Sequence, residues 1–328
     1  MIITKTPFRI SFFGGGSDLA SYYRKYGGCV LSTSINKYIY LSIHPYFDSS
    51  KIVLKYSKTE IVDNVKQIQH PIFKCALTEY NINGVEITST ADIPSGTGLG
   101  SSSSFTVGLL HTLNCYKGKY VSKGFLASDA SRIEIEELLS PIGKQDQYAA
   151  AFGGLNLIRF YTDDSVTVEP IMIEHNAYRK LQENLIMFYT GDVRTANSIL
   201  TEQNRNMNET DKIECLKKMC KIAEDMKYQL NNGCIDSFGE KLHENWLLKK
   251  QLANGISNEQ IDKYYYIAIN NGAEGGKLLG AGGGGFLLFY CQKEKQQKLR
   301  EVIGLNELKF SFEKDGSSIV FIGDKYWD

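Results

Sequence analysis

Residues 85–104 read VEITSTADIPSGTGLGSSSS, a strand-like half followed by a run of glycine and serine. Apolar and polar residues alternate over Val85–Ile93, which is the period of a half-buried β-strand. The apolar stripe of Phe105, Leu109 and Leu113 predicts that a helix begins directly after the serines. The sequence therefore predicts a strand, a tight glycine loop and a helix in direct succession.

This loop has the composition of an anion-binding site. Glycine has no Cβ, so the backbone can approach a ligand closely, and the first turn of the following helix offers free N–H groups and a positive dipole end. Both features favour phosphate, although a plain turn with a capped helix is the alternative. No Gly-Lys-Ser/Thr of a Walker loop follows. The expected phosphate contacts are Pro94, Gly96, Gly98, Leu99, Gly100, Ser101, Ser102 and Ser103.

Two further glycine clusters lie near the two ends of the chain. Residues 7–18 read PFRISFFGGGSD, and residues 275–286 read GGKLLGAGGGGF. Either cluster alone is consistent with a tight turn or a linker. Glycine in regular structure costs roughly 0.5–1 kcal/mol, so three clusters in a chain without low-complexity sequence favour a backbone surface shaped around a bulky ligand.

The composition argues against several classes of partner. Lysine plus arginine equals aspartate plus glutamate at 37 each, so no global positive charge attracts nucleic acid or an anionic membrane. No segment approaches the roughly 20 apolar residues of a membrane helix, and the first residues, MIITKTPFRI, contain no secretory apolar run. The seven cysteines include no CxxC pair. We expect a cytoplasmic protein, monomer or homodimer, with a small-molecule partner.

A chain of 328 residues predicts two domains, here 1–170 and 171–328. Strand patterns dominate the first part, and long amphipathic helices alternate with single strands in the second, which indicates an α/β (α+β) fold. The expected strands are Ile2–Phe13, Cys29–Ser34, Tyr38–Ile43, Lys51–Tyr56, Val85–Ile93, Leu185–Tyr189, Phe286–Tyr290, Leu308–Phe312 and Ile319–Ile322. The expected long helices are Ile213–Leu230, Phe238–Leu252 and Gln292–Val302.

The three glycine clusters have the order and positions of the three motifs of the GHMP superfamily of kinases, and the chain resembles that superfamily over essentially its whole length. The second cluster carries the family's PxGxGLGSS pattern without a gap, with Ser103 and Ser104 where many members have alanine. The resemblance implies an S5 domain 2-like N-terminal domain and a ferredoxin-like C-terminal domain. It also implies ATP and Mg²⁺ as cofactors.

Two segments, PFRISFFGGGSDL and IGKQDQYAAAFGGLN, resemble the sugar-kinase branch that contains heptose 7-phosphate kinases and fucokinase-type enzymes. The segments YTGDVRTANSIL and LHENWLLKKQLANGIS and the chain length favour the heptose kinases. This resemblance implies phosphorylation of the anomeric hydroxyl of D-glycero-D-manno-heptose 7-phosphate to the 1,7-bisphosphate, for nucleotide-activated heptose and surface polysaccharide. The alternatives are a kinase for an unphosphorylated sugar such as fucose or galactose, a mevalonate-type kinase, and a catalytically silent sugar-phosphate or nucleotide sensor.

The resemblance also assigns catalytic residues. Asp146 in GKQDQY matches the catalytic aspartate of the family, which would take the proton of the attacking hydroxyl. Arg9 matches a basic residue of the sugar kinases, and it would hold Asp146 ionised and stabilise phosphoryl charge. A helix cap is the competing role for Asp146, and a surface ion pair is the competing role for Arg9.

The remaining assignments concern the metal and the substrate. By the same resemblance, Glu134 and Ser102 would bind Mg²⁺, with Glu136 as an alternative carboxylate. Asp18 could contact the sugar or cap the following helix. A phosphorylated substrate needs a further basic group, and the candidates are Lys144, Arg194, Lys37 and Arg24. Lys144 and Arg194 also belong to the expected set of substrate-binding residues. That set is Gly15, Gly16, Ser17, Asp18, Lys144, Arg194, Gly282 and Gly283.

Overall fold

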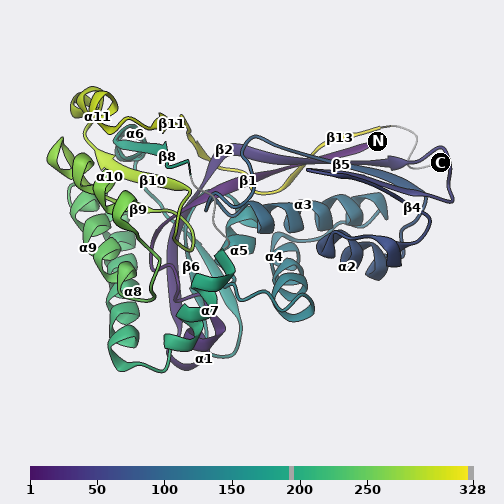
Figure 1. Ribbon diagram of the computed structural model, residues 1–328, viewed down its shortest axis with the longest axis horizontal. Coiled ribbons are helices and arrows are strands. Elements are labelled where there is room, and N and C mark those ends of the chain that lie inside the picture. Colours follow the sequence, from purple (N-terminus) through teal and green to yellow (C-terminus); the bar gives the residue numbers. More distant parts are fainter. Residues whose placement is uncertain (192–195, 324–328) are drawn as a thin grey trace.

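The computed structural model describes residues 1–191 and 196–323 of the chain. Its framework is a long antiparallel ribbon of β1 (Ile2–Phe13) and β2 (Gly28–Pro45), which runs through the middle of the molecule (Figure 1). The two halves of β2 have different outer partners, because residues 28–33 pair with β6 and residues 39–45 pair with β5. The ribbon therefore links two regions of sheet.

The sheet built on this ribbon has the strand order β13-β1-β2-β5-β3-β4, with β6 and β12 also on β2, and β7 on β6. Strand β3 pairs with β5 in parallel, whereas β1, β2 and β6 pair antiparallel with their neighbours. The remaining strands are β3 (Ile52–Lys55), β4 (Thr59–Val62), β5 (Val85–Ala91), β6 (Leu155–Phe160), β7 (Val166–Pro170), β12 (Phe312–Glu313) and β13 (Ser318–Ile322).

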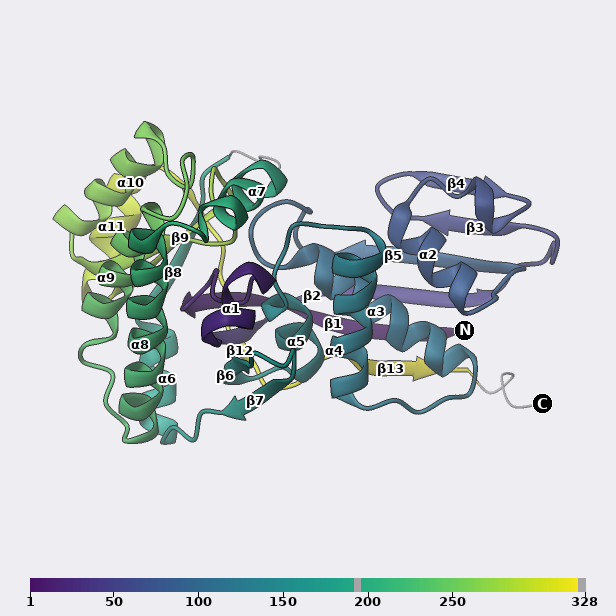
Figure 2. The ribbon, with the colours of Figure 1, turned by 90° about the horizontal axis from the view of Figure 1, so that it is seen from below.

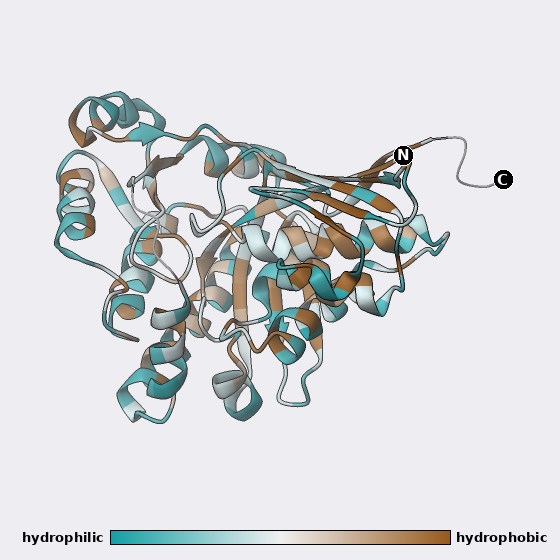
Figure 3. Cartoon of the chain, turned by 45° about the vertical axis from the view of Figure 1, so that its right-hand side comes forward, coloured by the Kyte–Doolittle hydropathy of each residue, from teal (hydrophilic) through white to brown (hydrophobic). Residues whose placement is uncertain are grey.

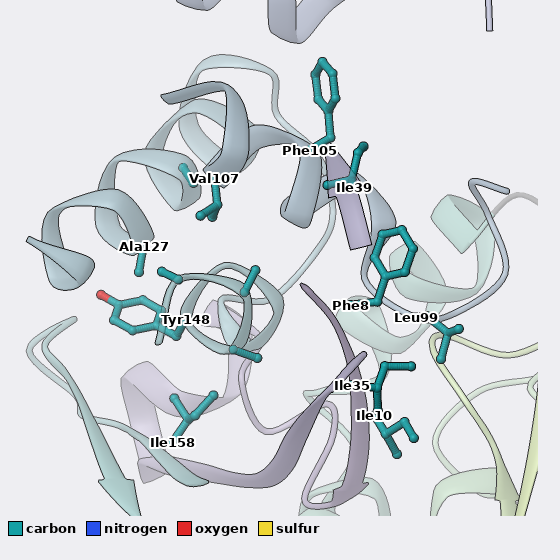
Figure 4. Close-up of a cluster of buried hydrophobic side chains, with 14 of the residues drawn as sticks. Phe8, Ile10, Ile35, Ile39, Leu99, Phe105, Val107, Ala127, Tyr148 and Ile158 are labelled. Carbon is teal, nitrogen blue, oxygen red and sulfur yellow. The ribbon is translucent and has the colours of Figure 1, made fainter. Parts of the chain in front are cut away.

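Helices of the first half cover one face of this sheet (Figures 1 and 2). Phe105 and Val107 on the helix after the glycine loop belong to the same buried cluster as Phe8 and Ile39 on the ribbon (Figure 4). The predicted apolar stripe of this helix is buried, and so is most of the rest of the helix. The helices are α1 (Ala20–Tyr26), α2 (Pro71–Glu79), α3 (Ser101–Tyr116), α4 (Lys123–Ser131) and α5 (Gln145–Phe152), with a π-helical turn at Arg132–Glu137 and a 3₁₀ turn at Val65–Gln67.

The second half forms a smaller sheet of order β11-β8-β10-β9, and helices α8 and α9 pack between it and the ribbon. Phe238 at the start of α9 meets the rings of Phe12 and Phe13 edge-on, with centroids 5.2 and 5.1 Å apart. Apolar residues gather on the inner strands, and polar residues on the outer sides of these helices (Figure 3).

The elements of this half are α6 (His175–Glu183), β8 (Leu185–Tyr189), α7 (Ala196–Asn206), α8 (Thr210–Asn231), α9 (Phe238–Lys250), α10 (Glu259–Asn270), β9 (Ala273–Leu278), β10 (Phe286–Cys291), a 3₁₀ turn at Lys293–Lys295, α11 (Gln296–Ile303) and β11 (Asn306–Glu307). None of the helices in the described ranges is both long and apolar enough to cross a bilayer.

The α/β (α+β) class is confirmed, and two local predictions are wrong. The strands expected at Cys29–Ser34 and Tyr38–Ile43 are one strand, because Asn36 and Lys37 form a bulge opposite the Pro7–Phe8 step and pairing then resumes. Of the strand expected at Leu308–Phe312, only Phe312 belongs to a strand, at the start of β12. Strands β11 and β12 pair with different sheets, β11 with β8 and β12 with β2, so the residues between them cross from one sheet to the other.

The domain division 1–170 and 171–328 stays a prediction. Near the end of the chain, β12 pairs with β2 and β13 pairs with β1, both within the first sheet. These last strands therefore contribute to the first layer, although they lie far beyond residue 170 in the sequence. Long-range strand pairing of this kind leaves no local signal in the sequence.

Candidate active site

The centre of the site is an ion pair between β1 and α5. Arg9 Nε donates to Asp146 Oδ1 at 2.7 Å, and Nη2 donates to Oδ2 at 2.8 Å. This bidentate contact fixes the orientation of the carboxylate as well as its charge. The Arg9 side chain is 5% exposed and that of Asp146 is 23% exposed, so the carboxylate keeps access to a ligand. Arg9 is therefore not part of a surface ion pair.

Asp146 lies in the first turn of α5 and does not cap it, since the N-cap residue is Lys144 and no side chain makes a capping bond. The third guanidinium nitrogen of Arg9, Nη1, donates to the carbonyl of Gly98 at 2.7 Å. One arginine thus joins the predicted base to the second glycine cluster. The two residues assigned to catalysis are brought together by the fold.

The glycine loop lies directly over this ion pair. A Cβ on Gly100 would stand 3.4 Å from Asp146 Oδ2 and 3.3 Å from Arg9 Cγ. Gly96, Gly98 and Gly100 have φ values of 78°, 86° and 77°, a region that glycine adopts without strain. Gly100 is the N-cap of α3 and no side chain caps this helix, so its first turn can bind an anion.

The third glycine cluster packs against the second. A Cβ on Gly98 would lie 2.4 Å from the Leu279 carbonyl oxygen, and one on Gly285 would lie 2.4 Å from that of Thr97. Only glycine permits these backbone contacts, so the third cluster holds the loop over the ion pair.

Gly282 and Gly283, which were predicted to bind the substrate, do not line the cavity at the site. Gly282 packs on the backbone of Ile256, and Gly283 N donates to the Ile256 carbonyl at 3.1 Å. Gly280 and Ala281 line the cavity at the site instead.

Glu134 and Ser102 also meet. Glu134 is 2% exposed, and its Oε1 and Oε2 accept hydrogen bonds from Ser102 Oγ and Gln147 Nε2, each at 2.7 Å. Burial raises the pKa of the Glu134 carboxyl. Glu136, the alternative carboxylate, is exposed on the same π-helical turn. The structure therefore places Glu134, and not Glu136, beside the glycine loop.

A cavity opens beside Asp146 between the two halves of the chain. The first half contributes the end of β1 with the first glycine cluster. It also contributes Ile142, Gly143, Gln145 and Asp146 around the start of α5. The second half contributes Leu200, Lys249, Lys277 and the loop at 280–281. Helix α7, which carries Leu200, lies beside α1 (Figure 2), where Ser21 Oγ donates to Asn204 Oδ1 at 2.7 Å.

Asp18 faces this cavity. Its carboxylate accepts hydrogen bonds from Gly16 N at 2.9 Å, Gln145 Nε2 at 3.1 Å and Gln145 N at 3.3 Å. Burial raises the pKa of Asp18. The N-cap of α1 is Leu19, without a side-chain capping bond, so the helix-cap alternative for Asp18 is wrong.

The other predicted residues of the first cluster divide into two groups. Gly15 and Gly16 line the cavity. Ser17 does not, because its Oγ donates to the Cys29 carbonyl and accepts from the Cys29 N–H. Ser17 thus fastens the glycine cluster to β2.

Three of the basic residues predicted to hold a substrate phosphate do not line the cavity. Lys144 Nζ and Arg24 Nε both contact Asp164 Oδ1, at 3.3 and 3.0 Å, outside the cavity. Lys37 is half-buried in the bulge of β2 and does not line the cavity. Arg194 lies outside the described residues.

Two lysines that the sequence analysis did not select line the cavity instead. Lys249 is 6% exposed and Lys277 is 3% exposed. Lys249 lies seven residues after Leu242 and three after Trp246, on the buried side of α9, and that spacing was the available signal. Lys277 lies within a buried stretch of β9, where no periodicity marks it.

Comparison with known proteins agrees with this geometry. Residues 58–154 match the GHMP kinases N-terminal domain and residues 226–305 match the GHMP kinases C-terminal domain. The chain is 30% identical to the D-glycero-alpha-D-manno-heptose 7-phosphate kinase of Campylobacter jejuni, over 96% of this chain and 97% of that one. A galactokinase of Pyrococcus furiosus is 27% identical over 52% of this chain and 49% of its own.

Among solved structures, a D-glycero-D-manno-heptose 1-phosphate kinase from Bacteroides thetaiotaomicron superposes with a TM-score of 0.81 and 26% identity, covering 98% of this chain and all of that one. A mevalonate kinase with a TM-score of 0.73 and 20% identity, over 96% of this chain and 100% of its own, shares the fold. The chain belongs to the GHMP kinase family, and the prediction of a kinase is confirmed.

The buried charge of Lys249 predicts a stability effect. Burial lowers the pKa of Lys249 from 10.5 to about 8, which corresponds to about 3 kcal/mol against the charged form. Below pH 8, Lys249 is protonated in both the folded and the unfolded chain, and the folded state bears the full cost of burying the charge. Between pH 8 and 10.5 only the unfolded chain keeps the proton, so this cost to the free energy of folding declines. Lys249→Met should therefore stabilise the ligand-free protein by up to about 3 kcal/mol at pH 7, and by less towards pH 10.

Urea unfolding at several pH values measures this difference. The matched control is Lys250→Met, since the neighbouring Lys250 is paired with Asp262 at 3.2 Å. A Lys249→Met protein less stable than the wild type at pH 7 would contradict the assignment of Lys249 as a costly buried charge.

Proposed function

We propose that this GHMP kinase is an ATP-dependent sugar kinase whose acceptor is a phosphorylated heptose, D-glycero-D-manno-heptose 7-phosphate, and whose product is the 1,7-bisphosphate. The observation that carries the proposal is the buried Arg9–Asp146 pair directly beneath the glycine loop at the start of α3. It puts an oriented carboxylate next to a backbone cradle suited to phosphate.

Phosphoryl transfer requires in-line positioning, charge stabilisation and a group that accepts the hydroxyl proton. In our proposal Asp146 accepts the proton of the anomeric hydroxyl, and Arg9 keeps the carboxylate in place. The loop 94–100 and the first turn of α3 bind the ATP phosphates. The cavity beside Asp146 receives the sugar, with Asp18 as an acceptor for sugar hydroxyls.

The choice of heptose rests on the relatives. The relative from Campylobacter jejuni is named a heptose 7-phosphate kinase and the one from Bacteroides thetaiotaomicron a heptose 1-phosphate kinase. The two names differ in the position of the existing phosphate and agree on a phosphorylated heptose. The galactokinases match only about half of the chain, so a free sugar is the less supported acceptor. A role in nucleotide-activated heptose synthesis in the cytoplasm follows from the same proposal.

Glu134 and Ser102 are the proposed ligands of Mg²⁺. One carboxylate, one hydroxyl and the phosphate oxygens of ATP form the hard oxygen set that Mg²⁺ prefers, and Mg²⁺ rarely needs a dedicated protein cage. In keeping with that, the described residues contain no group of three or more histidine, cysteine, aspartate or glutamate side chains placed to hold a metal. When bound, the ion would neutralise phosphate charge. Its own charge would offset the burial of Glu134.

The direct test is ADP release with Mg-ATP and a panel of acceptors: the heptose 7-phosphate, the heptose 1-phosphate, unphosphorylated heptose, fucose, galactose, mannose and mevalonate. Turnover confined to the 7-phosphate is expected. Preference for the heptose 1-phosphate would mean that the acceptor is a phosphorylated heptose but that a different hydroxyl reacts. Preference for a free sugar would contradict the proposal of a phosphorylated acceptor. Silence across the panel would favour a catalytically silent binding protein.

The Asp146→Asn variant tests the catalytic assignment. A positioned general base contributes about 10²- to 10⁴-fold, so kcat should fall by that amount. The affinity for nucleotide should stay unchanged, because the glycine loop is intact. Asp164→Asn is the control, since Asp164 pairs with Arg24 and Lys144 away from the cavity. Full activity of Asp146→Asn would remove this residue from the mechanism.

The Glu134→Gln variant tests the metal assignment. It removes the carboxylate charge with little change of shape, so half-maximal binding of a fluorescent ATP analogue should require at least about tenfold more Mg²⁺. The control is Glu136→Gln, an exposed residue of the same turn. If both variants follow the wild-type Mg²⁺ titration, Glu134 is not a ligand.

A further inference from the structure

The cavity contains two ammonium groups without a carboxylate partner among the described residues. Lys277 Nζ donates to the carbonyls of Ser11 and Phe12 at 2.8 and 2.9 Å. Lys249 Nζ makes only long contacts, 3.4 Å to the Gly15 carbonyl and 3.3 Å to Gln203 Oε1. Both side chains are almost fully buried. Each lysine is therefore held by neutral oxygens in a place where its charge is expensive.

The two carboxylates of the cavity do not neutralise these lysines. Asp146 is occupied by Arg9 in a bidentate pair. Asp18 already accepts from Gly16 and Gln145, and no ion pair within 4.0 Å joins it to either lysine. With Arg9, the cavity holds three cationic side chains against two carboxylates, which leaves one positive charge in excess.

Polar atoms next to these lysines also lack partners. Ser11 Oγ and Gln203 Nε2 make no hydrogen bond, although Ser11 is 5% exposed and Gln203 is fully buried. Buried polar atoms without a partner are rare in folded proteins and call for a ligand or water. A Cβ on Gly15 would lie 3.3 Å from Ser11 Oγ, and one on Gly16 would lie 2.2 Å from Gln203 Nε2. Because Gly15 and Gly16 have no side chain, there is room beside them for Ser11 Oγ and Gln203 Nε2.

We infer that Lys249 and Lys277, with Ser11 Oγ and Gln203 Nε2 as donors, form an anion subsite that binds the phosphate already present on the acceptor sugar. The inference rests on the proposed function and names the residues that select a phosphorylated acceptor. Two ammonium groups and two neutral donors match the acceptor-only chemistry of a phosphate dianion. Binding such an anion removes the penalty of burying the lysine charges.

Strand β1 sets the distance between this anion subsite and the proposed catalytic base, Asp146. Arg9 and Ser11 are two residues apart, so they point to the same face of the strand, about 6.6 Å apart by the rise per residue. Arg9 binds Asp146, and the Ser11 carbonyl binds Lys277. The reacting hydroxyl would lie near Asp146 and the existing phosphate near Lys249, at opposite ends of one sugar.

The test compares kcat/KM for phosphorylated and unphosphorylated forms of the same sugar, heptose 7-phosphate against heptose and mannose 6-phosphate against mannose. Loss of a hydrogen bond to a charged group corresponds to about 10- to 100-fold, so Lys249→Met should lower the preference for the phosphorylated form by that factor. The loss should appear mainly in KM. Lys250→Met, the neighbouring paired lysine, should keep the wild-type preference.

A binding measurement without ATP separates recognition from chemistry. Heptose 7-phosphate should protect the wild type against thermal unfolding more than heptose does, and Lys249→Met should lose that difference. If the wild type uses the phosphorylated heptose and Lys249→Met keeps its preference, the proposed function stands and the subsite is wrong. A loss of preference in Lys144→Met instead would move the subsite to Lys144 and its neighbour Arg24. A wild type that prefers free sugars overturns both proposals.

Discussion

The bidentate contact between Arg9 and Asp146 is the constraint on which the rest of the site depends. It joins the ribbon to α5, and through the Gly98 carbonyl it also holds the glycine loop. Three segments that are far apart in the sequence therefore meet at one guanidinium group. Each of the three guanidinium nitrogens of this almost fully buried arginine donates a hydrogen bond within the protein, so the geometry of the carboxylate is set before any ligand binds.

Close backbone packing keeps this arrangement in place. The second and third glycine clusters touch through Gly98 and Gly280, where a Cβ on Gly280 would stand 2.6 Å from the Gly98 Cα. The glycine loop at residues 94–100 thus packs directly against a loop of the second half of the chain. The phosphate cradle and the sheet of the second half form one structure, which explains why glycines distant in the sequence serve the same site.

The site also shows where stability is given up for function. Asp18 and Glu134 are buried carboxyls with raised pKa values, and Lys249 and Lys277 are buried amines with lowered ones. Burial is the first cause in each case, and it penalises the charged form. A core optimised only for folding would contain apolar residues at these positions. Groups with shifted pKa values that gather around one cavity and the adjacent glycine loop are typical of a functional site.

Local periodicity determined the class of fold and the strand–loop–helix of residues 85–116. The resemblance of the sequence motifs to a known family indicated the family and the Arg9–Asp146 and Ser102–Glu134 pairs, which the fold brings into contact. Only the tertiary structure decided where Lys144 lies and which lysines line the cavity. Helical spacing places Lys249 on the buried side of its helix, but nothing local marks Lys277, and the partner of each lysine is chosen by packing between distant elements. Lys249 and Lys277 come from different elements of the second half and meet the first glycine cluster only in the folded chain.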